Sequence, residues 1–114
     1  PIHLGVHDPK YAPARVARYA DGWRPGDLPP ADAVDAVTAV RRAAQERGRN
    51  PDQIELSVLL TPNENFPTLD DMSQYRKAGI RRIILRVMEA ATGDGVAAFR
   101  RFEPFLDQAK KLDP

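Results

Sequence analysis

The sequence lacks cysteine altogether, and it also lacks a strong net charge and any long hydrophobic run. The absence of cysteine excludes disulfides and thiolate metal sites. The 17 Lys and Arg residues nearly balance the 16 Asp and Glu residues, which leaves a net charge of +1 and no basic footprint for a nucleic acid. Apolar runs are only a few residues long, far short of the roughly 20 that span a bilayer. We therefore expect a cytoplasmic protein with no nucleic-acid or membrane partner.

The length of 114 residues corresponds to one domain, and a chain of this size buries about 65% of its unfolded surface. We expect residues 1–114 to form that single domain. The sequence begins directly with a strand-like segment, Pro-Ile-His-Leu-Gly-Val, without a polar lead-in. This beginning predicts that the chain is the C-terminal portion of a larger protein.

Strand-like and helix-like segments alternate along the chain, separated by glycine, proline, asparagine and aspartate. The pattern predicts strands over residues 2–6, 22–24, 54–60 and 82–87. It predicts helices from Pro13 to about residue 20, over residues 31–47, from Thr68 to residue 78, and over residues 95–112. Pro104 should kink or split the last of these helices.

The predicted helices carry recognisable faces and ends. In the second helix, one apolar stripe is expected to be buried; it consists of Val34, Val37, Val40 and Ala44. Thr68 and Asp71 have the spacing of a capping box at the start of the third helix. Gly48 and Gly79 are expected to end the second and third helices.

This alternation predicts an α/β fold made of four tandem βα units with parallel strands. The connections between the strands are expected to be right-handed crossovers. Two architectures stay open at this point. The units can form a small open sheet with helices on both faces, or they can form half of an eight-stranded barrel.

Five short motifs follow one another over nearly the whole chain. They are a Pro-hydrophobic-Gly strand (PIHLGV), a helix ending in Ala-Asp-Gly-Trp (ARVARYADGW), a helix ending in Gly-Arg-x-Pro (VTAVRRAAQERGRNP), a strand with Glu-x-Ser-Val (ELSV) and an Ala-Gly-hydrophobic-Arg strand (AGIRRIIL). In this order and spacing they resemble the C-terminal half of the luciferase-like monooxygenase family. The resemblance implies a TIM (β/α)₈ barrel, of which this chain is one half, in a flavin- or deazaflavin-dependent oxidoreductase.

The resemblance also implies a cofactor loop. In the family, the loop that follows the strand matching residues 2–6 meets the phosphate of FMN or of the deazaflavin coenzyme F-420, which assigns this role to Gly5, Val6, His7 and Asp8. Small residues suit that loop because several backbone N–H groups can then approach one anion. Gly5 keeps to this pattern, whereas Asp8 places a negative charge where a phosphate would lie. We therefore expect weak or no cofactor binding by this chain alone.

Lys10, Trp23 and Arg86 are further candidates for the cofactor site, and two interpretations stay open for each. Lys10 is either a neighbour of the phosphate or a solvated lysine. Trp23 either stacks near the flavin or fills the core, as its large apolar area favours. Arg86 pairs with an anionic substrate or phosphate if it points into the barrel, and otherwise lies on the surface.

Histidines and paired aspartates do not complete a catalytic or metal site in this sequence. His3 and His7 lie four residues apart, but no third ligand follows with matching spacing, so we expect no metal. The paired aspartates of the second and third helices lie in first turns, where negative charge stabilises the helix dipole. We assign no catalytic residue, because the resemblance places the catalytic residues in the N-terminal half of the barrel.

Half of a barrel exposes unpaired strand edges and an apolar inner face, both of which are costly in water. We therefore expect a homo-oligomer formed through that inner face or through the strand edges. Two functions stay open. The chain is either the phosphate-side, C-terminal portion of a luciferase-like oxidoreductase or monooxygenase, inactive alone, or a non-catalytic, self-associating α/β domain with no redox role. Binding of a flavin or deazaflavin separates the two.

Overall fold

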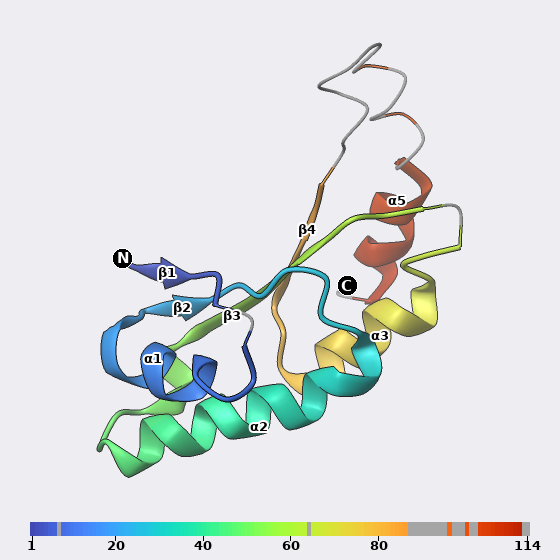
Figure 1. The fold of residues 1–114 in the computed structure, drawn as a ribbon. Helices are drawn as coiled ribbons and strands as arrows, with labels where there is room; N and C mark the ends of the chain where they lie inside the picture. Colours follow the sequence, from blue (N-terminus) through green and yellow to red (C-terminus); the bar gives the residue numbers. More distant parts are fainter. Residues whose placement is uncertain (7, 64, 87–95, 97–99, 101–102, 113–114) are drawn as a thin grey trace.

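The computed structural model describes residues 1–6, 8–63, 65–86, 96, 100 and 103–112. Strands and helices alternate along the chain (Figure 1). In order, they are β1 (His3–Leu4), α1 (Ala12–Tyr19), β2 (Gly22–Trp23), α2 (Pro30–Glu46), a 3-10 turn (Pro51–Gln53), β3 (Glu55–Leu60), α3 (Leu69–Ala78), β4 (Arg82–Leu85) and α5 (Glu103–Leu112). The predicted α/β fold with four parallel strands is therefore confirmed.

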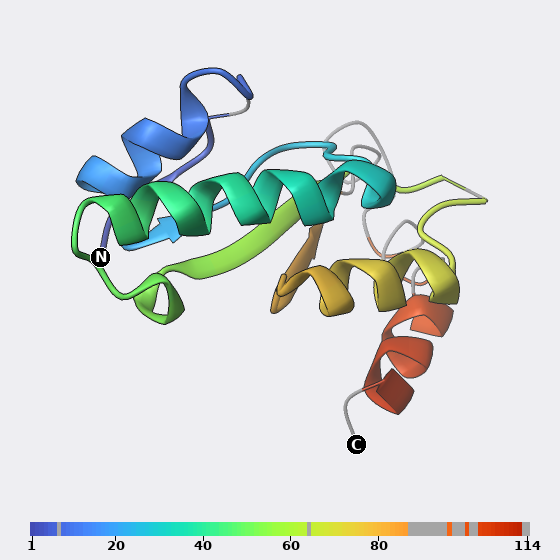
Figure 2. The same cartoon turned by 90° about the horizontal axis from the view of Figure 1, so that it is seen from below.

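The four strands form one parallel sheet in the order β1-β2-β3-β4, which is also their order in the chain. Each crossover therefore advances the sheet in the same direction. When right-handed crossovers all advance in one direction, the connecting helices lie on one face. Accordingly, α1, α2 and α3 lie side by side along one face of the strands (Figures 1 and 2). We call this face the helix side and the opposite face the open face.

The core lies between the sheet and these three helices. Alternate residues of β3 point into it, and Leu56, Val58 and Leu60 are all buried there. The helices contribute buried apolar residues that include Val16 from α1, Val40 from α2 and Tyr75 from α3. This alternation of β3 is expected for a strand with one face packed against helices.

The predicted stripe of α2 is wrong at its first position. Val34 is 54% exposed, whereas Ala33 is fully buried together with Val37, Val40 and Ala44. The spacings from Ala33 are four, three and four residues, which keep to one side of a helix with 3.6 residues per turn. Starting the stripe at Val34 instead gives two successive spacings of three residues, and the first residue then rotates out of the buried face.

The ends of α3 follow the sequence prediction closely. The Thr68 hydroxyl accepts a hydrogen bond from the Asp71 backbone N–H (3.1 Å), and the Asp71 carboxylate accepts one from the Thr68 N–H (2.8 Å), so the capping box is present. Gly79 ends the helix with φ of 101°, a conformation that favours glycine. In α5, Pro104 is the second residue of the helix, where the first turn tolerates it. The predicted helix before Glu103 lies mostly outside the described residues.

Proline also explains why β2 is short. The pairing of β2 with β3 begins with Gly22 beside Glu55 and is still in register at a bridge between Gly26 and Leu59. Pro25 lies between these points and has no N–H to donate, so it interrupts the ladder without shifting its register. Residues 22–26 therefore stay aligned with β3, although only Gly22–Trp23 form a regular strand.

Candidate functional site

The register of the sheet decides which side chains reach the open face. Successive residues of a strand point to opposite faces, and residues paired across parallel strands point to the same face. Because Leu56 faces the helices, its partner Trp23 does too, and Trp23 in turn pairs with Leu4. The residues that alternate with these lie on the open face. They are His3, Gly5, Gly22, Arg24, Gly26, Glu55, Ser57, Leu59, Arg82, Ile84 and Arg86.

A row of charged side chains crosses the open face near the start of the strands. The Glu55 carboxylate pairs with the Arg82 guanidinium (2.9 Å) and lies 3.8 Å from Nε2 of His3. The His3 ring passes over Gly22, where an added Cβ would lie only 2.2 Å from Nδ1 of the ring. Glycine at position 22 thus allows His3, from β1, to reach across β2 toward β3.

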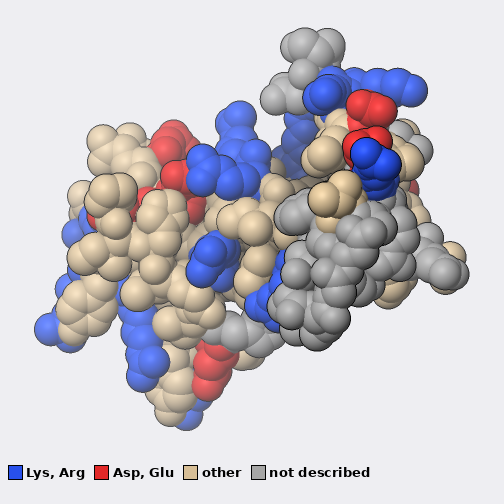
Figure 3. Space-filling model, turned by 90° about the horizontal axis from the view of Figure 1, so that it is seen from above, with Lys and Arg blue, Asp and Glu red and all other residues tan. Residues whose placement is uncertain are grey.

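Arginine dominates the rest of this face. Arg24 and Arg86 are exposed, and within the described part of the chain neither side chain forms a hydrogen bond or ion pair. Arg24 lies beside Ser57 on the open face. Its neighbours Gly5 and Gly26 have no side chains, so little else projects from the sheet around it. Figure 3 views the molecule from this side and shows cationic side chains rising from its surface. The arrangement suits an anion.

Apolar side chains on the described open face are limited to Leu59 and Ile84, which are paired and half-buried. Arg24 and Arg82 lie on either side of Ser57 in the preceding row of paired residues, and Arg86 lies two residues after Ile84 on the same face. The face therefore combines a small apolar centre with positive charge. Among the described residues, the apolar part of the inner face that we expected for half of a barrel consists of this pair.

The β1–α1 loop holds most of the residues that the family resemblance assigned to a phosphate. Asp8 Oδ1 accepts a hydrogen bond from the Lys10 backbone N–H (2.8 Å), and the Asp8 carbonyl accepts from the N–H groups of Tyr11 and Ala12. His7 lies outside the described residues. The Asp8 carboxylate thus occupies the Lys10 N–H, a group that a phosphate bound by this loop would need. Its negative charge also repels a phosphate. The described part of this loop does not fit a phosphate.

The other predicted site residues do not converge on one point. Val6 is half-buried against the core, and its carbonyl accepts a hydrogen bond from Trp23 Nε1 (2.7 Å). Trp23 itself is only 4% exposed and faces the helix side, whereas Arg86 follows β4 on the open face. Lys10 is exposed, with Nζ 5.2 Å from the centre of the Tyr11 ring. Gly5 is close to the Arg24 carbonyl, but an added Cβ would make only an ordinary contact of 3.5 Å there.

Arg24 lies on the open face but is not among the candidates expected from the sequence, although the sequence carries a signal for it. In the segment Gly22-Trp23-Arg24-Pro25-Gly26, alternate residues share a face, so Trp23 and Arg24 must point to opposite sides of the sheet. The buried tryptophan marks the helix side. Arg24 is consequently the residue of this pair that reaches the open face.

Within the residues that the structure describes, no three His, Asp or Glu side chains gather in a way that could hold a metal ion. The described helices also include none whose length and apolar content would let it cross a bilayer. Comparison of the chain with protein-family models, with curated proteins and with solved structures finds no match.

Proposed function

We propose that the chain is the C-terminal portion of a luciferase-like flavin- or deazaflavin-dependent oxidoreductase, with the open face of its sheet turned toward the inside of a (β/α)₈ barrel. The observation that supports this proposal is the strand order β1-β2-β3-β4 with α1, α2 and α3 on one face. A doubly wound sheet reverses its strand order and so covers both faces with helices. A barrel never reverses, and its inner face stays free of helices.

In this proposal the chain supplies the side of the site that receives the anionic group of the cofactor. The β1–α1 loop is filled by Asp8, so the anion is received by the arginines of the open face, chiefly Arg24 and Arg86. Hydride transfer belongs to the cofactor when it is bound, and the protein positions it. No residue of this chain is assigned a catalytic role, so the chain alone is expected to be inactive.

Titration with FMN and with riboflavin, followed by flavin fluorescence, tests this proposal, because the two ligands differ only in the phosphate. We expect FMN to bind with a dissociation constant on the order of 1 mM, or about −4 kcal/mol, and riboflavin to bind several-fold more weakly. Raising the salt concentration should weaken FMN binding, since exposed charges are screened. The double variant Arg24→Gln/Arg86→Gln should remove the preference for FMN.

Arg42→Gln provides a control, because Arg42 is exposed on α2 and its replacement also removes a positive charge. This variant should keep the preference for FMN. Equal binding of FMN and riboflavin, or no binding of either at millimolar concentration, would refute the assignment of a phosphate to the open face.

A second candidate is a non-catalytic, self-associating α/β domain, and the filled β1–α1 loop is the observation in its favour. The two ends of the described sheet, β1 and β4, are the places where another copy can add a strand. Pairing through the open faces is disfavoured, because it would bring like charges from two copies together. Light scattering at micromolar concentration should report a dimer if the edges pair. A monomer that does not distinguish FMN from riboflavin would remove both candidates.

A further inference from the structure

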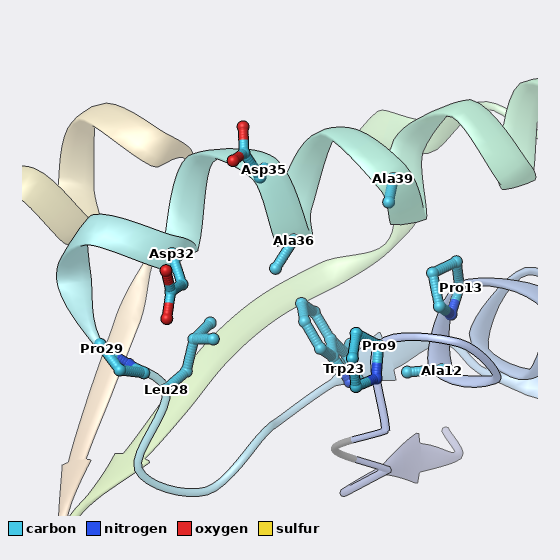
Figure 4. Close-up of a pocket in the computed structure, with 10 residues that line it drawn as sticks. All are labelled: Pro9, Ala12, Pro13, Trp23, Leu28, Pro29, Asp32, Asp35, Ala36 and Ala39. Atoms are coloured by element: carbon cyan, nitrogen blue, oxygen red, sulfur yellow. The ribbon is translucent and has the colours of Figure 1, made fainter.

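A cavity lies on the helix side of the sheet, on the opposite face from the arginines of the open face. Its volume is about 360 Å³, and it lies between the start of α1, the first half of α2 and the segment that joins β2 to α2 (Figure 4). Its walls are almost entirely apolar. They include Pro9, Pro13, Trp23, Leu28, Ala36 and Ala39.

Trp23 is one of the residues that line this cavity, and only 4% of it is exposed. The ring nitrogen already donates a hydrogen bond to the Val6 carbonyl, which fixes the orientation of the ring. In Figure 4 the ring lies opposite Ala36, whose small side chain leaves the space between α2 and the sheet open. The exposed part of the ring offers a ligand an apolar contact.

Asp32 supplies the charge at this cavity. It lies in the first turn of α2, and Figure 4 shows its carboxylate pointing toward the Leu28 side of the cavity, whereas Asp35 points away. Among the described residues, no side chain forms an ion pair or hydrogen bond with the Asp32 carboxylate. Asp32 is exposed to solvent, so its attraction for a cation is modest and is screened by salt.

The start of α2 does not offer a competing site for an anion. Helix N-termini usually attract anions through their free N–H groups. Here the residue before the helix is Pro29 and its first residue is Pro30, neither of which has an N–H, and the Asp32 N–H already donates to the Pro29 carbonyl. The negative charge of Asp32 also repels an anion at this end of the cavity.

We propose that this cavity binds a small organic ammonium ion, with the ammonium group on the Asp32 carboxylate and an apolar body of about one ring between the apolar walls of the cavity. The volume lies near the lower end of the range for small-molecule sites, which suits a ligand of that size. The proposal does not depend on the flavin proposal, because the two sites are on opposite faces of the sheet.

Trp23 is the only tryptophan of the chain, so its fluorescence reports on this cavity directly. We would titrate the full chain with phenethylamine, with the neutral 2-phenylethanol and with the anionic phenylacetate. Phenethylamine should change the Trp23 emission in a saturable way. The alcohol should bind about three- to tenfold more weakly, and phenylacetate should bind more weakly still.

Two variants separate the charge from the apolar space. Asp32→Asn should weaken phenethylamine binding by about three- to tenfold and leave binding of the alcohol unchanged. Ala36→Leu should fill the cavity and abolish binding of both. Asp70→Asn is the matched control, because Asp70 is an exposed aspartate in the first turn of α3 and its replacement changes the net charge equally.

Amide chemical shifts of α2 provide a second readout, and unchanged circular dichroism shows that each variant is folded. Shifts at Ala36 and Ala39 that saturate together with the Trp23 signal would support the site. The proposal is overturned if phenethylamine gives no saturable change, if phenylacetate binds as well as phenethylamine, or if Asp32→Asn behaves like Asp70→Asn.

Discussion

Arg49 ends a helix that lies some 30 residues earlier in the chain. Its guanidinium group donates to the carbonyls of Val16 (3.2 Å), Ala17 (2.8 Å) and Ala20 (2.8 Å), which belong to the last turn of α1 and the residue after it. The Val16 carbonyl also accepts from the Ala20 N–H (3.0 Å), whereas the carbonyls of Ala17 and Ala20 come after this last backbone bond of the helix. The helix dipole makes this end negative. Arg49 thus satisfies the end of α1 and joins it to the segment that leads into β3.

We predict that Arg49→Met lowers the free energy of unfolding by about 2–3 kcal/mol. Hydrogen bonds to a charged group contribute about 1.5–3 kcal/mol each, and two of the three contacts of Arg49 are short. The total is smaller than their sum because Arg49 is only half-buried, so water replaces part of what is lost. Methionine keeps most of the apolar stem, which limits the loss to the polar contacts.

Urea unfolding followed by Trp23 fluorescence measures this effect. Arg47→Met is the control, because Arg47 is exposed and its side chain makes no contact of this kind within the described chain; it should change stability by less than about 0.5 kcal/mol. Arg49→Lys should retain part of the stability, since lysine keeps the charge but not the planar fork. Equal midpoints for Arg49→Met and Arg47→Met would refute this account of the α1 end.

Three other predictions concern α3. The buried Tyr75 hydroxyl donates to the Leu28 carbonyl, so Tyr75→Phe should cost about 1–3 kcal/mol in urea unfolding by leaving that carbonyl unpaired. Burial, and then the charges of Asp71 and Asp27, raise the pKa of Tyr75 well above its usual value near 10. The unfolded chain therefore loses this proton first, and stability should fall as the pH rises above about 10, with a smaller slope in Tyr75→Phe; equal slopes would contradict this. Thr68→Ala should cost about 1 kcal/mol by removing the cap of α3, whereas Thr38→Ala, in the middle of α2, should be nearly neutral or stabilising.

Local features of the fold were predictable because they depend on residues close together in the sequence. The capping box of Thr68 and Asp71 is one example, and the parallel α/β arrangement is another, since it follows from the alternation of strand and helix periods. The predicted buried stripe of α2 is wrong only at its first residue. The residue one helical turn before Val37 can lie three or four positions earlier, and the structure buries Ala33 rather than Val34. These are errors of phase within an element, not of its type.

Features that depend on distant residues were not predictable. Arg49 caps α1 only because the turn after α2 returns along the end of that helix. The cavity likewise depends on how far the small residue Ala36 stands from Trp23, which is a property of helix packing rather than of either residue. The strand order could not be derived either, because four βα units are compatible with a sheet covered on one face or on both.

The pleat of β2 explains why the candidate sites divide as they do. Trp23 and Arg24 are adjacent in sequence, and a shared role is a natural first hypothesis for neighbours of such different chemistry. In an extended strand, however, they must point to opposite faces. The indole of Trp23 therefore lines a cavity that has a negative edge at Asp32, and the guanidinium of Arg24 joins a positive surface with Arg86.

A one-residue shift in the register of this segment would exchange Trp23 and Arg24, and would bury Arg24 under the helices without a partner. The fully buried Pro25, two residues after Trp23, would then lie on the open face. The register observed, with Gly22 beside Glu55 and Gly26 beside Leu59, is thus the one that keeps the charge in water and the apolar rings in the core.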